Sequence, residues 1–143
     1  LFSIPFIAAS SNTTLEPRIW LVLAILVFIL SVGGETLSDK QLAAFRGNPA
    51  NRGKTCRNGL WAWSRHPNYF FEWLHWFSYV LLAVGGGYFM LSLLGPVVML
   101  LFLYRVSGIP WTEAQAIRSR GDDYINYQKQ VSAFFPFPPK KLN

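Results

Sequence analysis

The sequence predicts an all-α, polytopic membrane protein with three full transmembrane helices, an N-terminal helix remnant and a cytoplasmic C-terminal tail. Two observations lead to this fold class. Of the 143 residues, 52% are hydrophobic and only 14% are charged, whereas about 25% of the residues of a soluble domain are charged. The apolar residues also lie in runs long enough to cross a hydrocarbon core of about 30 Å. The single cysteine, Cys56, excludes an internal disulfide and a cysteine-based zinc site.

The N-terminal third predicts one complete span. Leu1–Ala9 is apolar but too short to cross a bilayer, and no basic segment precedes it as in a signal peptide. We therefore expect residues 1–9 to end a preceding membrane helix, and the chain to be the C-terminal part of a longer protein. Ile19–Gly34 carries no charged residue and predicts a helix over 18–45.

A second apolar run predicts a helical hairpin. Trp73–Tyr104 contains no Asp, Glu, Lys or Arg and is too long for one untilted span. Gly85-Gly86-Gly87 divides it into helices over 69–84 and 88–106. Tryptophans gather where the hairpin begins, and Trp favours the membrane–water interface.

The distribution of charge orients the predicted spans. The net charge is +6, and basic residues concentrate in the loop 46–68 and in the tail 107–143. Lys and Arg in short loops mark the cytoplasmic side, so both segments are expected on that side of the membrane. Because topology accounts for the basic residues, the bilayer is the expected partner and nucleic acid is not.

Polar groups inside or beside a span suggest a functional site. Glu35 and Asp39 share one face at the end of the first helix, and Arg46 falls near that face if the helix continues. The segment RHPNYFFEWLH starts the hairpin, since Pro67 suits a first helical turn. Its polar members that mark a candidate site are Arg65, His66, Asn68, Tyr69, Glu72 and His75.

Three interpretations of this polar segment remain open. It could form interfacial ion pairs, or a metal site, because Glu72-x-x-His75 has the spacing found in di-iron bundles. A di-iron site needs a second such motif, which the sequence lacks, so no metal is predicted. A pocket for a charged organic cofactor fits best, because bases suit phosphates and aromatic rings suit stacking. The glycine motifs of Rossmann and P-loop folds are absent.

Three blocks carry a resemblance to a known family: ETLSDKQLAAFRGNPANRGK, GLWAWSRHPNYFFEWLHW and GDDYINYQKQVSAFFPFPP. Together, over about Gly33–Pro139, they resemble bacterial polytopic membrane proteins related to steroid 5-alpha-reductase. The resemblance implies an NADPH-dependent reductase of a carbon–carbon double bond in a lipid or sterol-like substrate, with this half holding NADPH. The catalytic tyrosine and glutamate of such enzymes lie in earlier helices, so no catalytic residue is assigned here.

The resemblance also implies cofactor roles for individual residues. Asp39, Asn68 and Glu72 would contact the nicotinamide or adenosine portions. The candidates for the phosphates are Arg46, Lys54, Arg65 and Arg105. Tyr124 and Tyr127 belong to the tail block that closes over the cofactor in such reductases. Phe71 departs from the family pattern, which has glycine there.

Two alternatives come from other classes of protein. Membrane methyltransferases for isoprenylcysteine or phospholipid head groups share the RHPNY segment and use S-adenosylmethionine. They carry two adjacent glutamates after the last span, where this chain has Thr112-Glu113. A chain without the substrate half could instead be a non-catalytic subunit, partnered by missing N-terminal helices or other membrane subunits.

Overall fold

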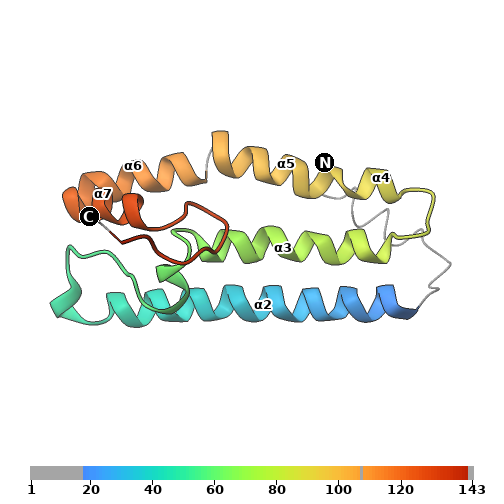
Figure 1. Ribbon diagram of the computed structural model, residues 1–143, viewed down its shortest axis with the longest axis horizontal. Coiled ribbons are helices and arrows are strands. Elements are labelled where there is room, and N and C mark those ends of the chain that lie inside the picture. The colour runs from blue at the N-terminus through green and yellow to red at the C-terminus, as the bar shows by residue number, and fades with distance from the viewer. Residues whose placement is uncertain (1–17, 107, 142–143) are drawn as a thin grey trace. The chain divides into compact units, whose positions relative to one another are not determined.

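The computed structural model describes residues 18–106 and 108–141, and within these ranges the regular structure is entirely helical (Figure 1). The described residues form two compact units. The first contains residues 18–33 and 71–102, and the second contains residues 34–70, 103–106 and 108–141. The expected helix remnant over residues 1–9 lies outside the described ranges. All cavities and contacts described below lie within a single unit.

The first helix, α2 (Arg18–Arg46), covers the predicted range 18–45. Its large apolar side chains are widely exposed: Leu26, Ile29 and Leu30 are 56%, 61% and 59% exposed. Two of its serine hydroxyls bond to the helix itself, Ser31 to the Phe28 carbonyl at 2.8 Å and Ser38 to the Gly34 carbonyl at 2.7 Å. In the part of the chain described, α2 therefore presents an apolar surface.

The second helix, α3 (Pro67–Leu82), begins at the proline that the sequence marks as a helix start. Its residues from Phe71 onward belong to the first unit, where the His75 ring contacts Phe28 of α2 with ring centroids 6.5 Å apart. The chain turns after α3 through Gly85, whose φ of 85° lies in the region that favours glycine. The predicted glycine turn is thus where the hairpin reverses.

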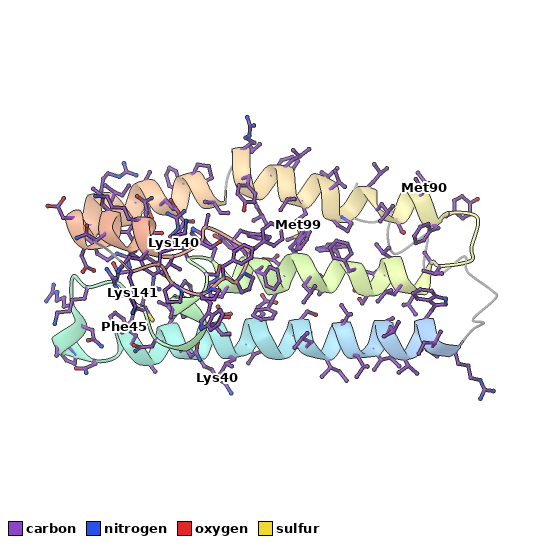
Figure 2. All side chains as sticks on the ribbon, viewed as in Figure 1. Lys40, Phe45, Met90, Met99, Lys140 and Lys141 are labelled. Atoms are coloured by element: carbon purple, nitrogen blue, oxygen red, sulfur yellow. The ribbon has the colours of Figure 1, made fainter. Side chains whose placement is uncertain are left out.

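The predicted helix over 88–106 is divided into pieces. It consists of α4 (Phe89–Ser92), α5 (Leu94–Leu101) and a π-helical stretch, η3 (Phe102–Val106). Pro96 explains the interruption near Leu93, because proline has no N–H to bond to the carbonyl four residues earlier. The Pro96 carbonyl accepts a hydrogen bond from the Trp73 indole of α3 at 3.0 Å. Met90 is 74% exposed, whereas Met99 is buried (both labelled in Figure 2).

Two stretches of the described chain are long and apolar enough to cross a membrane. They are Arg18–Arg46 and Phe89–Arg120, whose most apolar 18-residue windows have mean hydropathies of 2.2 and 2.0. Little of either stretch is buried. In the most apolar window of each stretch, 17% and 28% respectively are buried. A soluble core helix would be mostly buried, so these values are typical of helices that face lipid or other helices.

The second unit includes the C-terminal part of α2, from Gly34 onward. It contains two short 3-10 helices, η1 (Pro49–Asn51) and η2 (Gly59–Ala62), and then α6 (Ile109–Arg120) and α7 (Asp122–Gln130), which pack together (Figure 1). The N-cap of α7 is Gly121, whose φ of 57° suits glycine, and Asp122 is the first helical residue.

The C-terminal segment after α7 is fastened to the loop before α3. The Arg65 amide donates to the Ser132 carbonyl at 2.8 Å, and the Ser64 hydroxyl donates to the Phe134 carbonyl at 2.8 Å. The Phe134 side chain is fully buried against the rings of Phe70 and Tyr104. Phe134 packs into the second unit because it finds apolar partners there.

Candidate functional site

A basic cavity of about 1010 Å³ opens in the second unit. Its walls come from the C-terminal end of α2, the loop around η1 and one side of α6. Phe45, labelled in Figure 2, lies on its wall. Its basic lining residues are Arg46, Arg52, Lys54, Arg118 and Arg120. No Asp or Glu is among its lining residues, so the cavity is suited to an anion.

A smaller cavity of about 230 Å³ adjoins the first. The two cavities share four lining residues: Leu42, Arg46, Thr112 and Arg120. The remaining lining residues of the smaller cavity are Thr55, Cys56, Trp61, Arg65, His66, Asn68, Tyr69, Tyr124 and Tyr127. No Asp or Glu is among them. The aromatic rings and the Asn68 amide make the lining of the smaller cavity less dominated by charged groups than that of the larger one.

Local sequence shapes the loop that carries Arg52 and Lys54. Asn48 caps η1 by accepting a hydrogen bond from the Ala50 amide at 3.0 Å. The Asn51 side chain donates to the Phe45 carbonyl at the end of α2, also at 3.0 Å. Gly53 has a φ of 78°, which turns the chain back. These bonds hold both basic residues at the edge of the larger cavity.

A carboxylate behind the smaller cavity holds two of its lining residues. The Glu113 side chain lies 3.0 Å from Nη1 of Arg65 and 3.1 Å from Nε2 of His66. The His66 ring stacks on Tyr69, with centroids 5.4 Å apart and planes 9° from parallel. The first residues of α3 and the middle of α6 are thereby fixed to each other.

Helix α7 closes the other side of the smaller cavity. The Tyr127 hydroxyl donates to the Trp61 carbonyl at 2.5 Å and also lies 3.2 Å from the Ser64 carbonyl. The Arg57 guanidinium lies 5.4 Å from the centre of the Tyr127 ring, and the Arg120 guanidinium lies 4.9 Å from that of Tyr124. Both tyrosines are nearly fully buried.

Two arginines of the smaller cavity have a buried donor without a protein partner. Nε of Arg65 and Nε of Arg120 are buried and make no hydrogen bond with the described residues. A buried donor left unsatisfied costs about 1–3 kcal/mol. Arginine nitrogens suit the oxygens of phosphate, to which the guanidinium donates in a planar fork. The residues present therefore fit a phosphate-bearing ligand.

Burial sets the ionisation of the uncharged lining groups. It raises the pKa of the Cys56 thiol, although a backbone hydrogen bond at Asn58 and the charge of Arg46 act in the opposite direction. It also raises the pKa of Tyr124 and of Tyr127. These three groups are therefore neutral near pH 7, and the cavity keeps its positive charge.

Asp123 ties α7 to the loop before η2. Its carboxylate accepts a hydrogen bond from the Thr55 amide at 2.7 Å and lies 3.9 Å from the Arg57 guanidinium. Partial burial acts to raise the pKa of Asp123, but hydrogen bonding to Thr55 and the charge of Arg57 outweigh it and hold that pKa below its usual range.

The structure brings together most of the residues that the sequence suggests for a cofactor site. Those lining at least one of the two cavities are Arg46, Lys54, Arg65, His66, Asn68, Tyr69, Tyr124 and Tyr127. They come from four separate segments of the chain.

Four other suggested residues line neither cavity: Glu35, Asp39, Glu72 and Arg105. Glu35 and Asp39 precede Arg46 on α2 by eleven and seven residues, or about 16 and 10 Å of helix. Glu72 belongs to the first unit, and Arg105 is exposed on η3. Their cofactor roles stay predictions.

The sequence did not single out several residues that the fold places at the cavities. The basic ones are Arg52, Arg118 and Arg120, which serve as topology signals in the sequence. The signal for their second role is their distance from the predicted spans. Thr112 and Glu113 drew attention only as the counterpart of the methyltransferase glutamates, because their partners Tyr69 and Arg65 are more than forty residues away.

The Glu72-x-x-His75 spacing does not build a metal site among the described residues, which contain no group of three or more His, Cys, Asp or Glu placed to hold a metal ion. The His75 ring instead bonds through Nδ1 to the Glu72 carbonyl at 2.7 Å. Its other neighbours are the rings of Trp76 and Tyr79.

Comparison with known proteins identifies a family over most of the chain. No curated protein and no solved structure matches it. Residues 1–131 match a family of proteins of unknown function, DUF1295. This match includes both spanning stretches and the lining residues of both cavities. The chain therefore belongs to the DUF1295 family.

Proposed function

We propose that this chain supplies the NADPH site of a membrane-embedded reductase that reduces a carbon–carbon double bond of a lipid or sterol-like substrate. The observation that carries the proposal is the pair of adjoining cavities, lined by six basic residues and by no carboxylate: Arg46, Arg52, Lys54, Arg65, Arg118 and Arg120. NADPH carries three phosphate groups, and such an anion needs several arginines and lysines close together.

The division between the two cavities supports a dinucleotide rather than a simple anion. The larger cavity carries most of the positive charge, which suits phosphates. The smaller cavity adds the Asn68 amide and the stacked pair His66 and Tyr69, which suit a ring with an amide substituent. When bound, NADPH would supply the hydride, and the residues of this chain would bind it, orient it and limit the access of water.

The proposed topology places this site at the cytoplasmic ends of three spans in a bacterial inner membrane. The spans are α2, α3 and the stretch from α4 to η3, with the loop 46–68 and the residues after η3 on the cytoplasmic side. At about 24 Å, α3 is shorter than the hydrocarbon core. Trp63, four residues before α3, suits the interface.

The positive charge of the cavities also favours a reductase over a methyltransferase. S-adenosylmethionine carries a positive sulfonium, which a cluster of arginines would repel. In the methyltransferase interpretation Glu113 would serve the cofactor, whereas it lines neither cavity and is occupied by Arg65 and His66. The reductase interpretation is therefore preferred.

Calorimetric titration of the detergent-solubilised chain with NADPH tests the proposal. We expect binding that weakens as salt is added, since screening reduces charge attraction. Arg120→Ala should weaken binding by roughly tenfold or more, because a hydrogen bond to a charged group contributes about 1.5–3 kcal/mol. Asn68→Ala should also weaken it.

Lys40→Ala is the matched control. Lys40 is an exposed cation on α2 that lines neither cavity (Figure 2), so its removal should leave the affinity within about twofold. Binding of S-adenosylmethionine without binding of NADPH would favour the methyltransferase. Binding of neither would favour a non-catalytic membrane subunit.

A further inference from the structure

We propose that Glu113 is a positioning residue, which fixes the side chains of Arg65 and His66 at the wall of the smaller cavity so that they can engage a phosphate-bearing ligand. This inference rests on the proposed function and adds to it a residue that does not itself touch the ligand. Glu113 lines neither cavity, whereas Arg65 and His66 both line the smaller one.

The first support is the number of bonds that meet at one carboxylate. Glu113 accepts hydrogen bonds from Nη1 of Arg65 at 3.0 Å and from the Gln128 side-chain amide, and it lies 3.1 Å from Nε2 of His66. The donors come from the loop before α3 and from α7, while Glu113 is on α6. One side chain thus connects three segments that surround the smaller cavity.

The second support is burial. The side chains of Arg65, His66 and Glu113 are 12%, 4% and 13% exposed. Bonds so shielded from water are stronger than surface ion pairs and hold a side chain in one rotamer. A free arginine loses up to about 2 kcal/mol of rotamer entropy when a ligand fixes it, and a pre-positioned one has already lost it.

The third support is a nitrogen of the Arg65 guanidinium that Glu113 does not bind. Glu113 occupies a terminal nitrogen of Arg65, while Nε of the same guanidinium is buried and has no partner among the described residues. An arginine held by one edge and free at another can still bind an anion. Glu113 therefore orients Arg65 without using up all its donors.

The direction in which the Kd changes distinguishes a positioning role of Glu113 from a simple effect of its charge. Glu113 carries a negative charge behind a cavity for anions, so its charge alone weakens anion binding. If charge were its whole influence, neutralising it would tighten binding. If it positions Arg65 and His66, neutralising it weakens binding, because both side chains lose their fixed orientation.

The test compares wild type, Glu113→Gln and Glu113→Asp, with Asp122→Asn as the charge-matched control. Asp122 is exposed at the start of α7 and lines neither cavity. The Kd for NADPH and the Kd for inorganic pyrophosphate are measured by calorimetry, well below the Tm of each variant. At that temperature a purely structural role would lower Tm without changing either Kd.

We expect Glu113→Gln to raise both Kd values by roughly tenfold to a hundredfold, which is the range for a lost charge-assisted hydrogen bond. Glu113→Asp keeps the charge but withdraws the acceptor by one methylene, so it should give a smaller rise. Asp122→Asn should change Kd by less than about twofold. If Glu113→Gln does not fold, the rise in Glu113→Asp decides the question, because charge alone predicts none.

Unchanged or lower Kd values in the Glu113 variants would overturn the inference while leaving the proposed function intact. If wild type binds pyrophosphate but not NADPH, the proposed function is refuted. The Kd values for pyrophosphate alone then test the positioning role of Glu113. If wild type binds neither, both are overturned.

Discussion

Replacing Tyr127 with phenylalanine removes one hydroxyl from the most enclosed part of the second unit. The Tyr127 side chain is 1% exposed, and its hydroxyl bonds to the Trp61 carbonyl at 2.5 Å and lies 3.2 Å from that of Ser64. Both carbonyls precede α3 and flank residues that line the smaller cavity. The hydroxyl therefore connects α7 to the wall of the proposed site.

The expected loss of stability follows from these contacts. Phenylalanine keeps the ring and its packing, so the change is confined to the hydrogen bond and to the acceptor left behind. Leaving a buried acceptor unsatisfied costs about 1–3 kcal/mol. For a chain of 143 residues this corresponds to a fall in Tm of roughly 2–10 °C.

Denaturant or thermal unfolding in detergent, followed by circular dichroism, measures the change. Tyr124→Phe is the control, because Tyr124 is as buried, lies on the same helix and lines the same cavity, but its hydroxyl has no hydrogen bond with the described residues. We expect it to change the free energy of unfolding by less than about 0.5 kcal/mol. Equal effects of the two substitutions would refute the reasoning.

The pH dependence of stability offers a second check on Tyr127. Burial raises the pKa of its hydroxyl in the folded chain, so the fold favours the protonated form. The resulting stability is fully present below about pH 10, the unfolded value, and is lost as the pH rises above it. Tyr127→Phe should lose less stability than wild type over that range.

Three further substitutions test the packing of the second unit. Phe134→Ala should lower the free energy of unfolding by about 3–5 kcal/mol, because the side chain is fully buried; a loss below about 1 kcal/mol in denaturant unfolding would contradict this. The pKa of Asp123 is lowered in the folded chain, so its contribution is present above about pH 4 and is lost as the pH falls further. As the pH is lowered, Asp123→Asn should therefore lose less unfolding free energy than wild type. Parallel curves of unfolding free energy against pH for the two proteins would contradict this prediction. Gly59→Ala should lower the free energy of unfolding, derived from the Tm, by at least about 1–2 kcal/mol. The φ of 57° at this position disfavours a side chain, and the new Cβ would clash with the Gln41 side chain. An unchanged Tm would show that Gln41 moves freely.

Much of the helical structure could be read from local sequence. The uncharged run before Glu35 predicted α2, Pro67 marked the start of α3, and the glycines at 85–87 marked the turn after it. Each depends on neighbouring residues, through apolar length or backbone geometry. The division of the following helix at Leu93 was missed, although Pro96 gave a local reason for it.

The candidate site could be predicted only in part. The residues that carry the resemblance, such as Arg46 and Tyr127, do line the cavities, whereas Glu35 and Asp39 on α2 do not. A sequence shows which residues share a helix face but not how far along that face a cavity extends. The cofactor roles of Glu35 and Asp39 therefore stay predictions.

The sequence by itself determined that the chain is helical, that two of its stretches are apolar enough to span a membrane, and that its Lys and Arg residues lie outside the uncharged runs 19–34 and 73–104. These properties follow from composition and local order along the chain. Only the tertiary structure decided which charges meet. Arg46 and Arg120 are separated by more than seventy residues yet line the same cavities, and Glu113 joins Arg65 from nearly fifty residues away. Such contacts depend on how the loop before α3 packs against α6 and α7, which no local pattern encodes.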